Sequence, residues 1–354
     1  MRDLHQVQLK IDGAVFGGWK RVAIDRGLDN LSSAFSLAIT ERWPDQPERW
    51  IIKTGQACVV AIGGETVLTG WIDAGSFAID PESHPIEISG RDKTCDLVDC
   101  SADHKPGSWT KRSLEQIAAE LAAPFGVNVT AKTSTGAPFA KFALQQGETV
   151  FEAIDRMAKL RGVLLVSNES GGLELRRPGA VTAGYTLELG VNIKAIRFSD
   201  NARDRFSRYL LKGQAAGDEV SGTDAARPTA TATDPGVARH RPLMIMNDVQ
   251  STSASLAERA RWEATVRAAK GQDVVVTVSG WRDPSGALYR PDVLVPVKAA
   301  TIGVEGTLLV SAVRLVLDDR GQVAELTLVP KEAFSLMALP EPKVAASTTG
   351  RARR

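Results

Sequence analysis

The sequence predicts a mainly β protein with an α+β insertion. Apolar residues alternate with polar ones in the first hundred residues and again after residue 181, as expected of half-buried strands. Between these regions, two helical patterns each begin with a side-chain cap. The 31 glycines and an aromatic content of 6% agree with a chain that turns often.

The first region predicts a small antiparallel barrel or sandwich. Alternation starts at Val7, and the Asp12-Gly13 pair then turns the chain. The Gly63-Gly64 pair predicts a hairpin turn, and a further loop is expected at residues 81–85. The expected strands are residues 7–11, 35–39, 58–62, 66–72, 77–80 and 86–89.

Residues 105–180 predict a compact α+β module. Ser113 and Gln116 form a capping box for a helix over residues 114–122, and Thr149 and Glu152 form another for a helix that ends at Gly162. The expected strands are residues 126–131 and a hairpin, 163–168 with 173–177, around Gly171-Gly172.

After residue 181 the pattern is mostly β again. A helix is expected at Ser253–Lys270, and the Ala-, Thr-, Gly- and Pro-rich stretch 215–241 predicts a long loop or disordered insertion. The expected strands are residues 193–200, 207–214, 273–281, 293–299, 307–319 and 324–330. The resulting division is a first β unit at 1–104, the α+β module at 105–180, a second β unit at 181–338 and a disordered tail at 339–354.

The two β regions share one pattern. The stretch that begins at Gly64 and the stretch that begins at Gly306 both read as glycine, strand, turn, strand and a charged exit. Two such hairpins can arise by chance, or they can mark a duplicated β unit.

Charge and cysteine content narrow the class of protein. The net charge of +1 argues against a sequence-independent DNA binder, which usually carries a strong basic excess. Cys58, Cys95 and Cys100 form no CxxC pair, so we expect folding in a reducing cytoplasm without disulfides. The start of the chain lacks the apolar core of a signal peptide, and no run is long enough for a membrane-spanning helix.

Catalytic and metal-binding motifs are not recognisable in the sequence. A P-loop, a GxSxG elbow and an HExxH motif are all missing. The four histidines, His5, His84, His104 and His240, are scattered and have no partner at metal-ligand spacing. The sequence therefore nominates no catalytic, cofactor-binding or metal-binding residue.

The segment Gly90–His104 holds four aspartates, which makes a cation site one interpretation. Carboxylates suit Ca²⁺ or Mg²⁺, but on a helix they would lie about 6 Å apart per turn, too far to share an ion. The structural interpretation is favoured, with Leu97 turned inward. We expect Asp92 and Asp96 to make local hydrogen bonds or ion pairs, with Arg91 or Lys93 as candidate partners.

The segment Gly147–Asn168 is similar to a peptidoglycan-binding LysM repeat, which opens with Gly, an acidic residue and Thr before an amphipathic helix. The alternative is an ordinary capped helix followed by a strand. A second copy and a typical LysM ending are both missing, which favours the alternative.

The chain resembles the baseplate hub proteins of Mu-like contractile-tailed phages, relatives of the late-control D proteins and of hub modules in type VI secretion spikes. The motifs run in the family's order from near residue 5 to about residue 335; they are VLTGWIDAGSFAID, ISGRDKTCDLVDCSA, GSWTKRSLEQIAAELAAPFGVNV, GETVFEAIDRMAKLRGVLLVSN, RDRFSRYLLKGQ and RPLMIMND. The stretch 215–241 and the tail from Pro340 depart from the family pattern.

The resemblance implies a non-enzymatic virion protein of the tail baseplate, made in the host cytoplasm, without cofactors. It implies a homotrimer with two tail-tube-like β-barrels per chain, which joins the sixfold tail tube to the trimeric spike. The implied partners are tube subunits, the central spike, and baseplate wedge and tape-measure proteins; DNA passes through the ring without specific binding, and no stable membrane insertion is expected. Two alternatives stay open: a cell-wall-binding or cell-wall-hydrolysing tail protein, and a type VI-like injector spike component.

Overall fold

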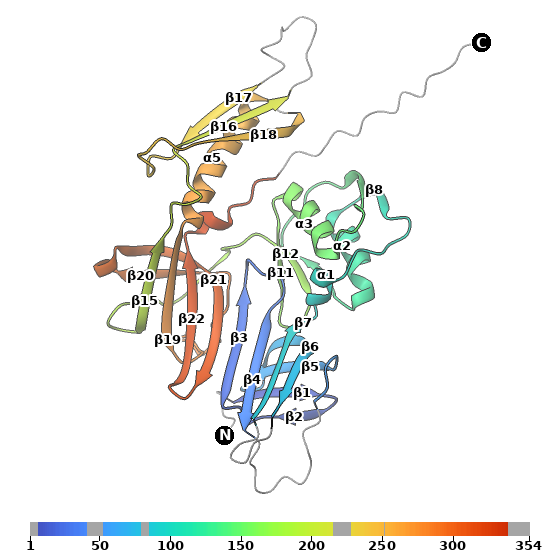
Figure 1. Cartoon of the computed structure of the whole chain (residues 1–354), viewed down its shortest axis with the longest axis vertical. Helices are drawn as coiled ribbons and strands as arrows, with labels where there is room; N and C mark the ends of the chain where they lie inside the picture. The colour runs from blue at the N-terminus through green and yellow to red at the C-terminus, as the bar shows by residue number, and fades with distance from the viewer. Residues whose placement is uncertain (1–5, 41–51, 79–84, 215–227, 251, 339–354) are drawn as a thin grey trace, which may run out of the picture.

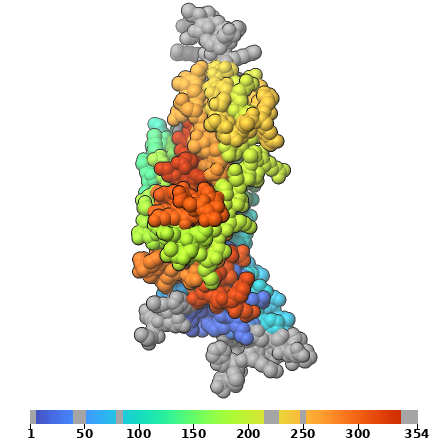
Figure 2. Space-filling view, turned by 90° about the vertical axis from the view of Figure 1, so that its left-hand side faces the viewer, coloured from blue at the N-terminus to red at the C-terminus, as the bar shows by residue number. Residues whose placement is uncertain are grey.

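The computed structural model describes residues 6–40, 52–78, 85–214, 228–250 and 252–338. The molecule is elongated, with a large sheet toward one end and a small sheet with one long helix toward the other (Figures 1 and 2). A helical module lies beside the large sheet, between these two ends (Figure 1). In the described part, no helix has both the length and the apolar character needed to cross a membrane.

The large sheet has 14 strands drawn from both ends of the chain. The first group is β1 (Val7–Ile11), β2 (Ala14–Phe16), β3 (Arg21–Gly27), β4 (Ala34–Thr40), β5 (Ala57–Ile62), β6 (Glu65–Phe77) and β7 (Pro85–Asp92). The second group is β13 (Val181–Thr182), β14 (Leu187–Glu188), β15 (Ile193–Asp200), β19 (Gln272–Ser279), β20 (Val293–Ala299), β21 (Val304–Asp318) and β22 (Gly321–Val329).

The alternating sequence explains how these strands share one core. In β1, Val7, Leu9 and Ile11 are buried while the residues between them are half-exposed, because successive side chains of a strand point to opposite faces. The same core cluster continues through both groups and includes the fully buried Trp281. The predicted turns at Asp12-Gly13 and Gly63-Gly64 are confirmed, since they join β1 to β2 and β5 to β6 as antiparallel pairs.

The two strand groups have the same order, which favours a duplicated β unit over a chance likeness of the two hairpins. Hydrogen-bonded neighbours run β3-β4-β7-β6-β5 in the first group and β15-β19-β22-β21-β20 in the second. Both long hairpins carry a register shift at the matching place, between Ile72 and Ala74 in β6 and between Val310 and Ala312 in β21. The chain therefore contains two β units of one design, here called the first and second halves of the sheet.

A second detail supports the duplication. Gly55 donates its amide hydrogen to the carbonyl of Ile72, and Asp292 donates to the carbonyl of Val310; each donor lies just before the first residue of the strand that precedes the hairpin, β5 or β20. Both donors have left-handed backbone angles, with φ of 81° for Gly55 and 67° for Asp292. Glycine adopts this conformation freely and Asp is among the few other residues that tolerate it.

The two halves are joined edge to edge. Strand β3 of the first half pairs antiparallel with the C-terminal part of β21, from Ala312 opposite Gly27 to Leu317 opposite Val22. The N-terminal part of the same β21 edge pairs with β20. The sheet is therefore continuous across the two halves (Figure 1).

The α+β module follows β7 and has its own core. Its elements are α1 (Cys95–Asp99), β8 (Ser108–Arg112), α2 (Leu114–Ala122), β9 (Val129–Ala131), β10 (Phe139–Ala143), α3 (Val150–Arg161), β11 (Leu164–Ser167) and β12 (Leu173–Arg176). Both predicted capping boxes are confirmed, at Ser113 with Gln116 and at Thr149 with Glu152. Gly162 ends α3 in the left-handed conformation that the sequence pattern requires.

A small sheet and a helix are inserted between β15 and β19. Strand β16 (Arg208–Gln214) lies between β17 (Thr229–Thr233) and β18 (Pro242–Gln250), and α5 (Ser253–Lys270) packs on them at the predicted range. The expectation of a long loop or disordered insertion over 215–241, whose part at 215–227 lies outside the described residues, is wrong for residues 229–233. There, alternating Thr and Ala form a strand, with Ala230 and Ala232 packed against the core under α5. The expected tail at 339–354 lies outside the described residues.

Candidate functional site at the junction of sheet and module

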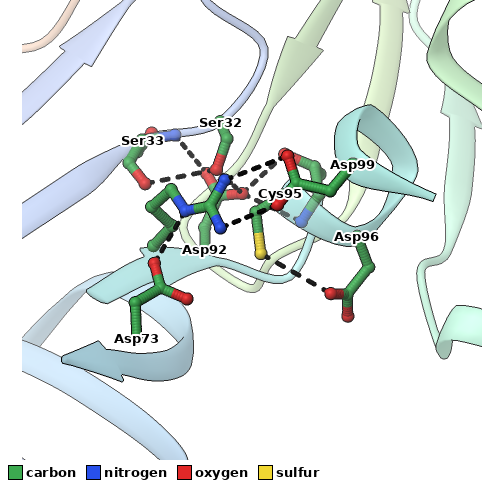
Figure 3. Close-up of polar contacts among 9 residues, drawn as sticks. Ser32, Ser33, Asp73, Asp92, Cys95, Asp96 and Asp99 are labelled. Atoms are coloured by element: carbon green, nitrogen blue, oxygen red, sulfur yellow. Dashed lines mark hydrogen bonds and ion pairs between the residues drawn. The ribbon is translucent and has the colours of Figure 1, made fainter. Parts of the chain in front are cut away.

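The aspartate-rich segment Gly90–His104 lies where β7 leaves the large sheet and the chain enters the α+β module (Figure 3). Its four aspartates do not share one helix, because α1 has only five residues and includes only Asp96 and Asp99. Asp92 is the last residue of β7, and Asp103 lies beyond α1. The helical spacing of the four carboxylates is therefore not realised in space.

Asp92 is the buried centre of the junction. Its carboxylate is 1% exposed and accepts hydrogen bonds from the amides of Ser33 (2.7 Å) and Thr94 (2.9 Å). The hydroxyls of Ser32 and Thr94 donate to it as well, at 3.2 and 2.5 Å. The expected local hydrogen bonding of Asp92 is confirmed at Thr94, whereas Ser32 and Ser33 are distant along the chain and neither Arg91 nor Lys93 is a partner among the hydrogen bonds of the described residues. A buried carboxylate with this many donors ties the β3–β4 turn to the start of α1.

Arg91 makes the ion pairs of the junction. Its Nε lies 2.7 Å from Asp73 Oδ2, and its Nη2 lies 2.8 Å from Asp99 Oδ2. The hydrogen bonds from Arg91 hold the pKa of Asp99 below its usual range. The pairs connect β6, β7 and α1, although solvent screens them because all three side chains are at least one-third exposed.

Neither Asp96 nor His104 takes part in a carboxylate cluster. Asp96 accepts a long contact from Cys95 Sγ, at 3.8 Å, and among the described residues it forms no ion pair with Lys93, the partner that was expected. The His104 ring packs against Trp109 with a centroid distance of 4.8 Å, and its Nε2 lies 3.8 Å from Glu120. Within the described ranges, no group of three His, Cys, Asp or Glu side chains is arranged to hold a metal ion.

The cysteines are small, mostly buried side chains. Cys58 and Cys95 are buried, Cys100 is half-buried, and all three are free thiols. Burial raises the pKa of Cys58 and of Cys95 to about 12, so both thiols stay protonated and unreactive at neutral pH.

The LysM-like segment Gly147–Asn168 forms the second capped helix, α3, and strand β11. The buried side of α3 includes Val150, Ile154 and Met157, which pack in the core of the module. Its carboxyl end leads into β11, which pairs with β12. This geometry is that of an ordinary capped helix followed by a strand, which was the alternative to a LysM repeat.

Contacts with the first half of the sheet fix the module at the turn between β11 and β12. Arg26 of β3 forms an ion pair of 2.5 Å with Glu169, and Thr69 of β6 donates to the backbone carbonyl of Glu169 at 2.9 Å. Gly171 comes so close that an added Cβ would lie 2.6 Å from the carbonyl oxygen of Thr69. The sequence pattern does not indicate these partners, because they lie about a hundred residues or more from Glu169 along the chain.

A buried aspartate fixes the other side of the module to the second half of the sheet. Asp292 is 4% exposed; it accepts a 2.6 Å hydrogen bond from the Gly179 amide, and its Oδ2 lies 3.1 Å from Arg176 Nη2. Burial raises the pKa of Asp292, although Gly179 and Arg176 oppose that rise. The module is therefore held by polar contacts to both halves of the sheet.

Comparisons with known proteins agree with this organisation. Three family models match separate parts of the chain in order: "Mu phage baseplate assembly protein GpP-like, N-terminal" at residues 6–92, "Baseplate hub protein gp44-like, second domain" at 94–177, and "Mu phage baseplate assembly protein GpP, fourth domain" at 252–337. The baseplate hub protein gp44 of Escherichia phage Mu is 37% identical over 338 residues, which cover 93% of this chain and 88% of that protein.

Solved structures share the fold over nearly the whole chain. A 43 kDa tail protein of prophage MuSo2 from Shewanella oneidensis has a TM-score of 0.84 at 37% identity, covering 94% of this chain and 100% of that one. A tail protein from Neisseria meningitidis MC58 has a TM-score of 0.78 at 24% identity, covering 95% and 99%. An E. coli component of the type VI secretion system shares the fold at a TM-score of 0.55 and 10% identity, covering 94% of this chain and 80% of that one.

These similarities, together with the duplicated β units, define a structural protein of a phage tail, located in the baseplate of the virion. The chain belongs to the family of the baseplate hub protein gp44 of phage Mu. The resemblance to Mu-like baseplate hubs stated from the sequence is thereby confirmed.

Proposed function

We propose that three copies of this chain form the hub ring of a contractile-tail baseplate, which adapts the sixfold tail tube to a trimeric central spike. The duplicated strand order carries the proposal. Three chains with two similar β units each would present six such units to the tube and threefold symmetry to the spike. A ring of this kind leaves a central channel for the ejection of DNA.

In the proposed ring, each part of the chain has its own role. Residues 1–104 and 181–338 each supply one tube-like unit, and residues 105–180 form a module at the rim of the ring. The separate core of the module and its clamping by Glu169 and Asp292 support a rigid attachment. The proposed partners are tail tube subunits, the spike protein, and baseplate wedge and tape-measure proteins.

The role is proposed to be mechanical, without catalysis or a cofactor. Asp92 and Asp99 are held by internal hydrogen bonds and ion pairs, and Cys58 and Cys95 are buried, which supports a structural task. The near-neutral net charge of +1 agrees with a channel that DNA crosses without being held.

Light scattering of the purified full-length protein and electron microscopy of the assembled tail test the proposal. We expect a trimeric ring with the two β units of each chain alternating around the channel. A tail in which this protein is monomeric, or lies outside the tube axis, would contradict the hub assignment.

The cell-wall alternatives are tested separately. Incubation with purified sacculi should give neither sedimentation with the cell wall nor release of soluble muropeptides. Either result would instead favour a peptidoglycan-binding or peptidoglycan-hydrolysing tail protein. The type VI-like alternative predicts that the chain is found in an injector lacking a DNA-filled head, which the same micrographs would reveal.

A further inference from the structure

The joint between the two halves of the sheet provides a template for contacts between chains. In that joint, β3 of the first half pairs with the part of β21 that extends beyond β20. The Leu28 amide adds a 2.8 Å hydrogen bond to the carbonyl of Ser311. The central pair is Ile24 opposite Leu315, which are 0% and 2% exposed.

The corresponding edges, one along β15 and one along the last residues of β6, have no partner strand among the described residues. Strand β15, the counterpart of β3, pairs with β19 on one edge and ends the sheet on the other. Strand β6, the counterpart of β21, pairs with β5 only as far as Trp71. Residues 73–77 of β6 are all exposed, and β15 is exposed or half-exposed beyond Ile193. Figure 2 looks onto the β15 side, where the yellow-green atoms of this region lie at the surface.

The strand pairings give the residue correspondence. Ile24 pairs with Phe35, Phe35 pairs with Gly90, and Gly90 pairs with Ile72. Ile72 is the residue before the register shift in β6. By the same route, Phe198 of β15 pairs with Val274, Val274 pairs with Leu328, and Leu328 pairs with Val310. Val310 is the residue before the register shift in β21. Phe198 is therefore the counterpart of Ile24.

The other partner follows from the same register shifts. Phe77 lies five residues after Ile72, and Leu315 lies five residues after Val310. Phe77 is therefore the counterpart of Leu315. The two phenylalanines, Phe77 and Phe198, are 53% and 39% exposed, whereas their counterparts are buried against each other. Two large exposed apolar side chains at these matching edge positions indicate an interface that one chain alone cannot complete.

We propose that β15 of one copy pairs antiparallel with residues 74–78 in and after β6 of the next copy, with Phe198 opposite Phe77. The occupant of each edge is a second copy of this chain, because the pairing repeats the joint already present within the chain. Each copy uses both edges once, so the contact is head-to-tail and can close into a ring. The inference rests on the proposed trimer and adds its strand pairing and register.

The chemistry of the neighbouring pairs is compatible with this register. In the joint within the chain, Arg314 lies opposite Asp25, with 3.6 Å between Nε and Oδ1. The corresponding pair in the proposed contact between copies is Ser76 opposite Ser199. Like charges are therefore not brought together at this pair, and the small hydroxyl side chains allow the two strands to approach.

A pair of introduced thiols tests the register without removing either phenylalanine. In the full-length Ser76→Cys/Ser199→Cys protein, paired residues of an antiparallel ladder lie within disulfide range. Oxidation should give disulfide-linked species up to the trimer on a non-reducing gel, while each single variant should not. The matched control is Ser76→Cys/Asp200→Cys, which keeps both phenylalanines and in which a one-residue shift places the two thiols on opposite faces of the sheet. It should cross-link much less.

The contribution of the two phenylalanines is tested by measuring the association of the copies in light scattering. Phe77→Asp and Phe198→Asp should each weaken assembly about tenfold or more, as expected for buried aromatic anchors. Met244→Asp, which changes an equally exposed residue of the small sheet, should leave assembly unchanged.

The outcomes separate this inference from the proposed function. A trimer that gives no cross-link between positions 76 and 199 and tolerates both Asp substitutions would overturn the pairing but keep the hub assignment. A protein that is monomeric both in solution and in the tail, and gives no cross-link, would contradict both.

Discussion

Ile24 of β3 lies directly opposite Leu315 of β21, and both side chains are almost completely buried. They come from opposite ends of the chain and meet where the first half of the sheet joins the second. The two halves therefore share one core, and the chain folds as a rigid pair of β units.

The first prediction concerns this joint. Leu315→Ala should lower the free energy of unfolding by about 2–5 kcal/mol, because it leaves a cavity between the two halves. Urea denaturation followed by tryptophan fluorescence measures the change. Val15→Ala, at a residue that is 58% exposed, is the control and should change stability by less than about 0.5 kcal/mol. Equal effects of the two substitutions would contradict the role of the joint.

The second prediction concerns the buried carboxylate at the junction. Asp92→Asn should destabilise the protein by about 2–4 kcal/mol, because the new amide group turns hydrogens toward the donors of Ser33 and Thr94. Asp96→Asn, a neighbouring change with one weak side-chain contact, should cost less than about 0.5 kcal/mol. Thermal unfolding of the two variants side by side gives the comparison, and similar losses would argue against the anchoring role of Asp92.

The third prediction concerns pH. Burial of Glu169 raises the pKa of its carboxyl, but the charge and hydrogen bond of Arg26, a backbone hydrogen bond and the charge of Arg290 together leave the pKa below its usual value. The unfolded chain therefore takes up the proton first as the pH falls. The stabilisation is complete above the unfolded pKa of about 4.3 and is lost as the pH falls through the folded value.

Glu169→Gln should accordingly lower stability at pH 7 by only about 0.5–1 kcal/mol, because the carboxylate is 44% exposed and partly screened. Urea midpoints of both proteins should converge as the pH is lowered below about 4. Glu305→Gln, at an exposed position of β21, serves as the control. A difference that persists unchanged in acid would show that Glu169 acts through packing and not through its charge.

The fourth prediction concerns the α+β module. Its buried core residues, apart from Leu31, all lie between Leu97 and Leu175. A fragment of residues 93–178 should therefore fold alone and unfold cooperatively, with a circular dichroism spectrum of mixed helix and strand. A fragment without a cooperative transition would show that the module depends on the sheet for its fold.

Local patterns made much of the fold predictable. Capping boxes such as Ser113 with Gln116 involve residues three positions apart, and strand alternation at Val7–Ile11 requires only that one face be buried. The strand Thr229–Thr233 escapes prediction because its short Ala and Thr side chains resemble a loop in composition. It becomes a strand through pairing with β16 and packing under α5.

The partners of the junction could not be predicted in the same way. The sequence indicated that Asp92 makes local hydrogen bonds, but Ser32 and Ser33 are separated from it by about sixty residues. Only the pairing of β4 with β7 brings them to the carboxylate. The same holds for Arg26 and Glu169, which are 143 positions apart.

The sequence by itself determined the mainly β class, the two capped helices and the family, because these depend on local periodicity and on motifs in a fixed order. The tertiary structure alone decided that the two β units share one sheet, and which edges the sheet leaves without a partner strand in the described part of the chain. The register between distant strands depends on which faces become buried together. That is a property of the whole packed core, and no single segment contains it.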